Sequence, residues 1–174
     1  GLLLNIDKDH QEIDELISIF TTFKSNSKSL FIVNRSNALA GKLSAGAQYD
    51  FASTSGTGAA FEAENFSQEG LHIYFEVKGT TFHLQTVGRH NMENALAAIT
   101  LALQLGIAIE ICAQALAKYE GIYRRHQVLG KTNGVLLIDD YAHNPVKCAS
   151  SIEACQPIAP KVIAWFQPHG YGPT

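Results

Sequence analysis

The sequence predicts an α/β protein in which two strand–helix–strand units flank an antiparallel section. Short apolar runs followed by helical stripes of apolar residues occur near both ends of the chain, and short segments of alternating apolar and polar residues occupy its middle. The 174 residues are 46% hydrophobic and 17% charged, a composition that suits one ordinary core or two small ones.

The first unit covers the start of the chain. Residues 2–6 form a short apolar run that predicts a strand, and a helical stripe follows at Ile13, Leu16, Ile17, Phe20 and Phe23. Asp9 and Glu12 have the spacing of a capping box, so we expect the helix to begin near His10. Residues 30–33 predict the next strand, which completes a unit with a parallel sheet.

The middle of the chain, from about residue 49 to 87, predicts antiparallel hairpins. Residues 71–77 and 81–84 alternate apolar and polar side chains, and Lys78 and Gly79 separate the two segments. Two helices are expected next, at 91–104 and 109–119, followed by Gly121, where we place a domain boundary.

The last part predicts a second parallel unit. Residues 135–138 have the pattern of a buried strand, Asn144 and Pro145 suit the N-cap and first turn of a helix, and residues 162–166 predict another strand. A right-handed crossover would make the two strands parallel. The polar residues after each strand would then share the edge of the sheet where open α/β proteins bind ligands.

Composition excludes several classes of protein. The formal charge of -3 and the pI near 6.2 provide no large positive field for nucleic acid. The best candidate for a membrane helix, 95–111, is interrupted by polar residues and falls short of the roughly 18 apolar residues required. Cys112, Cys148 and Cys155 show no metal or disulfide spacing, which favours reduced thiols in a cytoplasmic protein.

Four polar clusters carry the residues suited to chemistry: 5–10, 88–94, 123–125 together with 138–145, and 166–169. In order and approximate spacing they resemble the motifs of the Mur ligase family, and within it the enzymes that join L-alanine to UDP-N-acetylmuramate. Each cluster alone is moderately specific, and their common order along nearly the whole chain carries the resemblance.

The resemblance implies a domain organisation. Mur ligases have a UDP-binding domain, a central ATPase domain and a C-terminal Rossmann-like domain. Residues 1–120 resemble the later part of the central domain, a three-layer portion with a parallel sheet and a small antiparallel section. Residues 121–174 resemble the start of the C-terminal domain.

The resemblance also implies a reaction of peptidoglycan precursor synthesis, with ATP and Mg²⁺ as cofactors. The carboxylate of UDP-N-acetylmuramate attacks the γ-phosphate of ATP to give an acyl phosphate, and the amine of the incoming amino acid, expected to be L-alanine, displaces phosphate. Such phosphoryl transfer depends on positioned cations and metal-neutralised oxygens.

Individual site residues follow from matching positions. His10 matches a family histidine near the magnesium ion, Asn91 and Asn94 match a pair that contacts the nucleotide, and Arg125 and Asp140 match residues that hold ATP from the C-terminal domain. Three further residues match the region that faces the incoming amino acid: Tyr141, His143 and His169.

The residues alone also allow plainer interpretations. His10 and Asn91 could be capping residues at helix starts, and Asp139 could cap the last helix. Arg124 and Arg125 could form a solvated surface pair. Three other histidines are interpreted as structural: His72, His83 and His126.

The sequence also departs from the family pattern. Asn144 stands where the motif commonly has a second histidine, and Gly170 and Pro173 stand where arginines would hold the acceptor carboxylate. The loop at 56–58 lacks the Gly-Lys-Ser/Thr sequence of a phosphate loop, and no other segment supplies one. We therefore expect the isolated chain to be inactive.

Three alternatives remain open from the sequence. The parent could be a divergent paralogue acting on another amino acid or on a recycled peptide. The chain could instead be a non-catalytic binding module, or an unrelated nucleotide-binding domain. If the sheet lacks strands before residue 2, its exposed edge also predicts self-association.

Overall fold

The computed structural model describes residues 1–7 and 12–168. Its first unit consists of β1 (Leu2–Leu3), α1 (Ile13–Asn26) and β2 (Ile32–Val33), with β1 and β2 parallel. This confirms the predicted strand–helix–strand unit. The predicted helix start near His10 is wrong, because α1 begins at Ile13, where Asp14 and Glu15 in the first turn interact favourably with the helix dipole.

The buried Asp50 connects this unit with the next part of the sheet. Its Oδ1 accepts a hydrogen bond from the Val33 N–H at 3.1 Å, and its Oδ2 lies 3.6 Å from a guanidinium nitrogen of Arg35 and accepts from the Ser44 hydroxyl. The carboxylate is fully buried, so these partners replace the water that it loses on folding.

The prediction of antiparallel pairing between residues 49 and 87 holds for only part of this range. After α2 (Ala38–Gly41), β3 (Phe51–Ala52) pairs with β4 (Phe61–Glu62) in parallel, contrary to that prediction. The segment between them, residues 53–60, is a loop long enough to return the chain to the start of β3. Strands of only two residues are too short to be recognised from alternating apolar and polar side chains.

The predicted hairpin is confirmed in the three-stranded antiparallel sheet of β5 (Glu64–Glu69), β6 (His72–Val77) and β7 (Thr80–Leu84). Lys78 and Gly79 form the turn between β6 and β7, with φ of 50° and 75°. Two positive φ values are characteristic of the two-residue turns that match the twist of a hairpin.

Helices α3 (Arg89–Gln104) and α4 (Ile109–Leu116) follow near the predicted positions. One face of α3 is buried against the sheets through Met92, Ala95, Leu96 and Ile99. Phe75 and Phe82 stack in the same core with ring centroids 5.4 Å apart. No helix in the described ranges is long and apolar enough to cross a membrane.

The predicted second parallel unit is wrong. Strand β9 (Val135–Asp139) pairs in antiparallel fashion with β8 (Gln127–Thr132), and residues 162–166 form no strand. The cause lies in Asn133 and Gly134, with φ of 50° and 81°, because Asn-Gly is a strong hairpin signal that sends the chain straight back. The prediction that 135–138 is buried is also wrong, since Val135 and Leu137 are 59% and 53% exposed.

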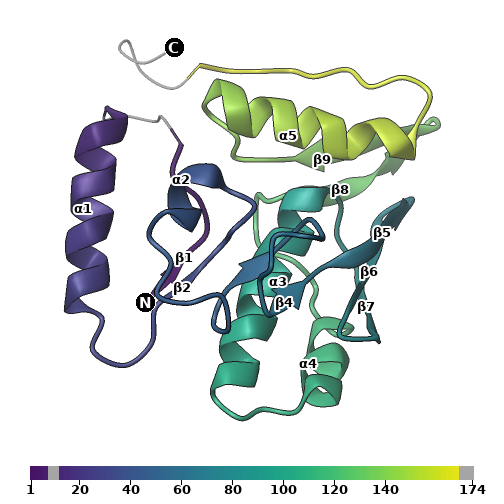
Figure 1. The fold of residues 1–174 in the computed structure, drawn as a ribbon. Coiled ribbons are helices and arrows are strands. Elements are labelled where there is room, and N and C mark those ends of the chain that lie inside the picture. The colour runs from purple at the N-terminus through teal and green to yellow at the C-terminus, as the bar shows by residue number, and fades with distance from the viewer. Residues whose placement is uncertain (8–11, 169–174) are drawn as a thin grey trace.

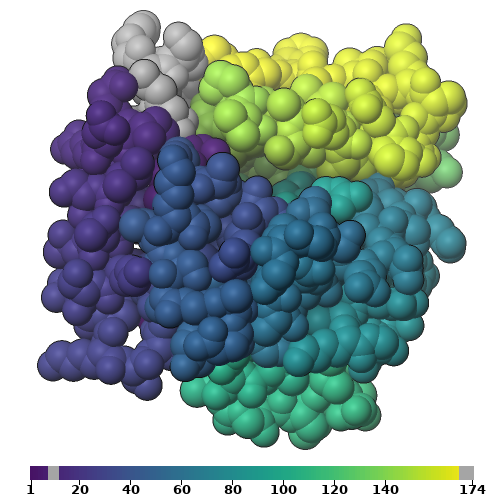
Figure 2. Space-filling view, viewed as in Figure 1, coloured from purple at the N-terminus to yellow at the C-terminus, as the bar shows by residue number. Residues whose placement is uncertain are grey.

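The last helix, α5 (Pro145–Cys155), is confirmed together with its cap, since the Asn144 side chain accepts a hydrogen bond from the Lys147 N–H. A short 3₁₀ turn, η1 (Gln156–Ile158), follows. Figure 1 shows α5 and the β8–β9 hairpin across one end of the molecule, above α3 and the antiparallel sheet. Residues 159–168 run back along α5, and the space-filling view shows this part as a layer over the central sheets (Figure 2).

Candidate functional site

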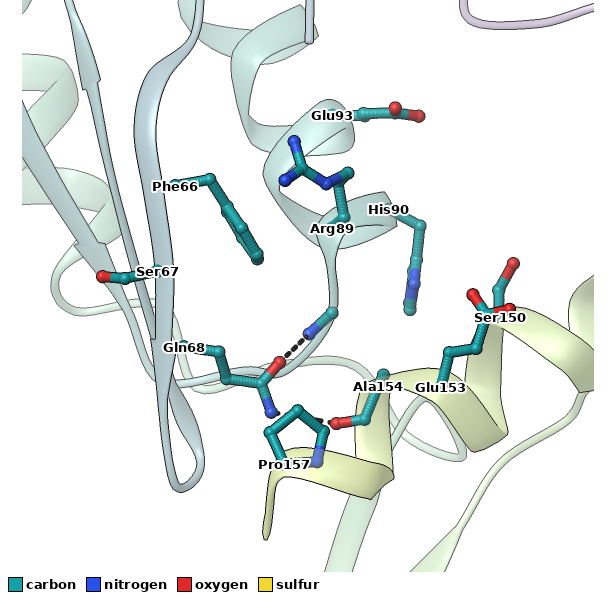
Figure 3. Close-up of a pocket in the computed structure, with 11 residues that line it drawn as sticks. Phe66, Ser67, Gln68, Arg89, His90, Glu93, Ser150, Glu153, Ala154 and Pro157 are labelled. Carbon is teal, nitrogen blue, oxygen red and sulfur yellow. Dashed lines mark hydrogen bonds between the residues drawn. The ribbon is translucent and has the colours of Figure 1, made fainter. Parts of the chain in front are cut away.

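The N-terminus of α3 is the meeting point of the central sheets and α5. Gly88 precedes the helix with φ 85° and ψ 148°, a conformation essentially restricted to glycine. The Gly88 N–H donates to Gln68 Oε1 at 2.9 Å, and Gln68 Nε2 donates to the Ala154 carbonyl at 2.9 Å. One side chain of β5 therefore holds the start of α3 and the last turn of α5 together (Figure 3).

The predicted nucleotide pair lies on the first turns of α3. Asn91 Nδ2 donates to Thr86 Oγ1 at 3.0 Å and to the Val87 carbonyl at 2.8 Å, so the amide N–H groups hold the turn before the helix. Asn94, one turn later, is exposed. The capping interpretation of Asn91 is wrong, because Gly88 is the N-cap of α3 and no side chain accepts a cap hydrogen bond there. The Asn91 amide instead donates to the preceding turn, while Asn94 is exposed.

The two adjacent arginines have different surroundings. Arg124 Nε lies 3.2 Å from Asp139 Oδ2, and its guanidinium lies over the Tyr141 ring at 5.2 Å. The Arg125 guanidinium lies 5.8 Å from the centroid of the same ring. Among the described residues, Arg125 forms no ion pair with a carboxylate. The alternative of Asp139 as a helix cap is wrong, because Asn144 caps α5.

Asp140 is engaged by its own chain. Its Oδ1 accepts from the Ala142 N–H at 2.8 Å, and its Oδ2 accepts from the His126 N–H at 2.8 Å and lies 3.2 Å from His126 Nδ1. The carboxyl side chain is 15% exposed. The His126 imidazole reaches on to α5, where Nε2 lies 3.1 Å from Ser151 Oγ.

His90 contacts this group from the other side. Its ring centroid lies 5.1 Å from that of His126. Burial, together with electrostatic interactions with His126 and Arg125, lowers the pKa of His90 to about 4, and the Asp140 carboxylate offsets part of this shift. His90 is therefore neutral near pH 7. From the sequence, His126 is interpreted as structural, and His90 lies in the 88–94 cluster without a role of its own. The position of His126 directly after Arg125 is the signal that could have linked it to the site.

A cavity of about 270 Å³ brings two of the motif clusters together. It lies between the end of β1 and the start of α5, and its lining includes Asn5, Asp7, Asn144 and Lys147. Asn5 and Asp7 belong to the cluster at 5–10 and Asn144 to the cluster at 138–145, more than a hundred positions away in the sequence. Beside Asn144, His143 Nδ1 lies 3.0 Å from the Tyr141 carbonyl oxygen.

Two predicted site residues, His10 and His169, lie outside the described residues, as do Gly170 and Pro173. Among residues 1–7 and 12–168, no group of three His, Cys, Asp or Glu side chains is placed to hold a metal ion. The Mg²⁺ site therefore stays a prediction.

A larger cavity, of about 510 Å³, lies between β5, α3 and α5. The Arg89 guanidinium lies 4.6 Å from the Phe66 ring centroid on one wall, and His90 and Glu93 come from the same helix (Figure 3). These α3 residues lie on a face next to the one that carries Asn91, which does not line the cavity.

The loop at 56–58 is occupied by the chain itself. The N–H groups of Gly56, Thr57 and Gly58 donate to the Glu62 carboxylate at 2.9, 2.8 and 3.0 Å. Burial acts to raise the pKa of Glu62, but these hydrogen bonds and one from the Thr57 hydroxyl together lower it. The N–H groups of this loop bind a carboxylate of the chain itself, which agrees with the conclusion from the sequence that the loop is no phosphate loop.

Comparison with known proteins identifies the class of protein. The family model described as the Mur ligase middle domain matches residues 1–102. The chain belongs to the Mur ligase family, which confirms the resemblance seen in its motifs.

Within that family, relatives similar to this chain are UDP-N-acetylmuramate–L-alanine ligases. The enzyme of Alkaliphilus metalliredigens is 35% identical over 190 residues, which cover 100% of this chain and 41% of the relative. The enzyme of Desulforamulus reducens is 34% identical over 135 residues, which cover 77% of this chain and 28% of the relative. The chain thus spans between 28% and 41% of the length of these two relatives.

Solved structures confirm the predicted α/β fold class. The UDP-N-acetylmuramate-alanine ligase of Thermotoga maritima superposes with a TM-score of 0.75 at 23% identity, covering 90% of this chain and 38% of that one. A MurF of Acinetobacter baumannii also gives a TM-score of 0.75, at 21% identity, over 90% of this chain and 37% of that one.

Proposed function

We propose that the chain is part of an ATP-dependent ligase of peptidoglycan precursor synthesis, which adds an amino acid, expected to be L-alanine, to UDP-N-acetylmuramate in the cytoplasm. The observation that carries this proposal is the cavity where Asn5 and Asp7 face Asn144 and Lys147. Two family motifs distant in sequence meet there, on a chain whose relatives bear the name of that ligase.

ATP is the proposed nucleotide, and Asn91 and Asn94 are its proposed base contacts. Because both N–H groups of Asn91 face the acceptors Thr86 Oγ1 and the Val87 carbonyl, the amide orientation is fixed and only its oxygen remains for a ligand. A lone acceptor at this position favours the exocyclic amino group of adenine over the carbonyl oxygen of guanine. Asn94 is exposed and can offer both a donor and an acceptor.

Arg125 and Asp140 are proposed to act on the phosphates from the C-terminal domain. Arg125 carries the charge for this role, because Arg124 is already paired with Asp139. Mg²⁺ would neutralise phosphate oxygens beside the substrate carboxylate. His10 is its proposed ligand by motif position. The Asp7 carboxylate lines the cavity between the clusters at 5–10 and 138–145, and it suits a cation that prefers oxygen.

Tyr141, His143 and His169 are the proposed contacts for the acceptor amino acid. The Tyr141 side chain is 44% exposed and stands beside His143, with ring centroids 5.2 Å apart. These two rings closely precede Asn144, which lines the cavity of about 270 Å³, and an aromatic ring and an imidazole there can orient a small amine.

Two further expectations remain part of the proposal. The domain boundary lies near Gly121, with residues 1–120 in the central domain and 121–174 in the C-terminal domain. Strand β1 pairs only with β2 among the described strands, so its outer edge is the proposed surface for self-association.

The proposed function is tested by comparing Arg125→Ala with Arg124→Ala in the full-length protein. ADP formation is measured with UDP-N-acetylmuramate, ATP and a panel of amino acids. We expect Arg125→Ala to lower kcat/KM by about 10-fold or more with every acceptor, because a charge-assisted phosphate contact contributes roughly 1.5–3 kcal/mol. Arg124→Ala should have a smaller effect. Absence of ADP formation by the unmodified protein would favour a non-catalytic binding module.

A further inference from the structure

We propose that His126 is a positioning residue, which holds the Asp140 carboxylate in one orientation beside Arg125 and fastens it to helix α5. The contact itself is independent of any ligand. Its consequence for ATP rests on the role proposed above for Arg125 and Asp140.

The first step of the argument is the double contact with Asp140. Both the His126 N–H, at 2.8 Å, and the imidazole Nδ1, at 3.2 Å, face the same carboxylate oxygen, Oδ2. The other oxygen accepts from the Ala142 N–H. Three nitrogen atoms thus contact a carboxylate on a loop that follows a solvated hairpin. Two of them are backbone N–H groups, and the third, Nδ1, is the contribution of the His126 side chain.

The second step concerns the backbone on either side of Arg125. Arg124 and His126 have φ of 55° and 46°, in the left-handed region that residues with a Cβ seldom adopt. This path turns the His126 side chain into the interior, where it is 3% exposed, and leaves Arg125 at the surface over Tyr141. Strained conformations persist when surrounding contacts hold them, and the imidazole supplies such contacts here.

The third step is the far side of the imidazole. His126 Nε2 lies 3.1 Å from Ser151 Oγ and 3.3 Å from the Ser151 carbonyl oxygen, both on α5. The ring therefore joins the Arg125–Asp140 loop to the helix that covers α3. A phenylalanine could fill the same volume, but it would make neither polar contact.

The series Asp140–His126–Ser151 also resembles the connectivity of a nucleophile-activating triad. Ser151 does not suit that role, because it lies within α5 and its own carbonyl shares the imidazole nitrogen with its hydroxyl. The geometry favours positioning over catalysis.

The test uses two substitutions that each keep one of the two polar contacts of the imidazole, and a third that keeps neither. His126→Asn places an amide nitrogen near the position of Nδ1, whereas His126→Gln reaches toward Ser151, and His126→Phe keeps only the shape. Ser151→Ala is the matched control on α5. NMR coupling constants that report the χ1 rotamer of Asp140 are measured in the 174-residue chain, without ATP.

We expect a single Asp140 rotamer in the unmodified chain, in His126→Asn and in Ser151→Ala, and averaged couplings in His126→Gln and His126→Phe. An Asp140 rotamer that stays fixed in His126→Gln would overturn the inference. If His126→Phe does not fold, the comparison of Asn with Gln decides, and equal couplings in these two variants count against positioning.

The consequence for ATP is measured separately in the full-length protein. His126→Gln should raise KM for ATP several-fold, with a smaller change in kcat, and His126→Asn should restore KM. Averaged Asp140 couplings with an unchanged KM would support the positioning contact and overturn the ATP role proposed for Asp140. The failure of one proposal is thus distinguishable from the failure of the other.

Discussion

Replacement of Gly88 by alanine tests the packing of α5 against the start of α3. A Cβ at this position would lie 2.7 Å from the Ala154 Cβ and 2.7 Å from Cε1 of His90, both far inside normal contact distance. The backbone also disfavours any side chain, since φ 85° with ψ 148° belongs to a region essentially limited to glycine.

The expected loss of stability has two parts. The backbone conformation costs roughly 1–3 kcal/mol for a residue with a Cβ. Forcing a methyl group into a packed contact costs about 1–3 kcal/mol more. Gly88→Ala should therefore lower the free energy of unfolding by roughly 2–6 kcal/mol, a large fraction of the 5–15 kcal/mol of an average domain.

Urea denaturation followed by circular dichroism measures this loss, and Gly106→Ala is the matched control. Gly106 also has a positive φ, 83°, but a Cβ there would meet nothing within 4 Å. In an Ala154→Gly background part of the clash at residue 88 disappears, so Gly88→Ala should cost less there. Equal costs at residues 88 and 106, with no relief from Ala154→Gly, would refute the docking of α5 on α3.

Three other predictions concern pH and activity. The pKa of His90 is lowered from 6.5 to about 4, so the unfolded chain takes up a proton there more readily than the folded chain. The contribution of the neutral His90 to folding stability is therefore complete above pH 6.5 and is lost as pH falls toward 4. Urea denaturation between pH 7 and 4 should show a loss of unfolding free energy on the order of 1–2 kcal/mol, after allowance for the partial exposure of His90. His90→Gln should make the unfolding free energy depend less on pH. The isolated chain should release no phosphate from ATP, and turnover above a denatured control would contradict this. In the full-length protein, Gly170→Arg should change the ranking of acceptors by kcat/KM at saturating ATP, and an unchanged ranking would argue against a carboxylate-binding role for that position.

The elements predicted correctly share one property, a signal contained within a short stretch of sequence. Alternating apolar and polar side chains and the Lys78-Gly79 turn predict the β6–β7 hairpin, and Asn144 with Pro145 predicts the start of α5. The β8–β9 hairpin had an equally local signal in Asn133-Gly134, and it was missed because the apolar run at 135–138 was paired with the wrong neighbour. Residues 162–166 are different, since an apolar run does not reveal which strand, if any, lies beside it.

The candidate site divides along the same line. Motif order placed Asn91, Arg125 and Asp140 in one family pattern, but it contained no information on which side chains would support them. Gln68 reaches Ala154 across 86 positions, and His126 reaches Ser151 across 25. Such contacts depend on how the β8–β9 hairpin and α5 pack over α3, and the periodicity and motif spacing of the sequence do not predict that packing. Because these supporting residues lie outside the motif clusters, relatives could keep the motifs and still hold the two parts together by different contacts. Substitutions at Gln68 or His126 therefore test the stability of this junction, where substitutions in the motifs would disturb the chemistry as well.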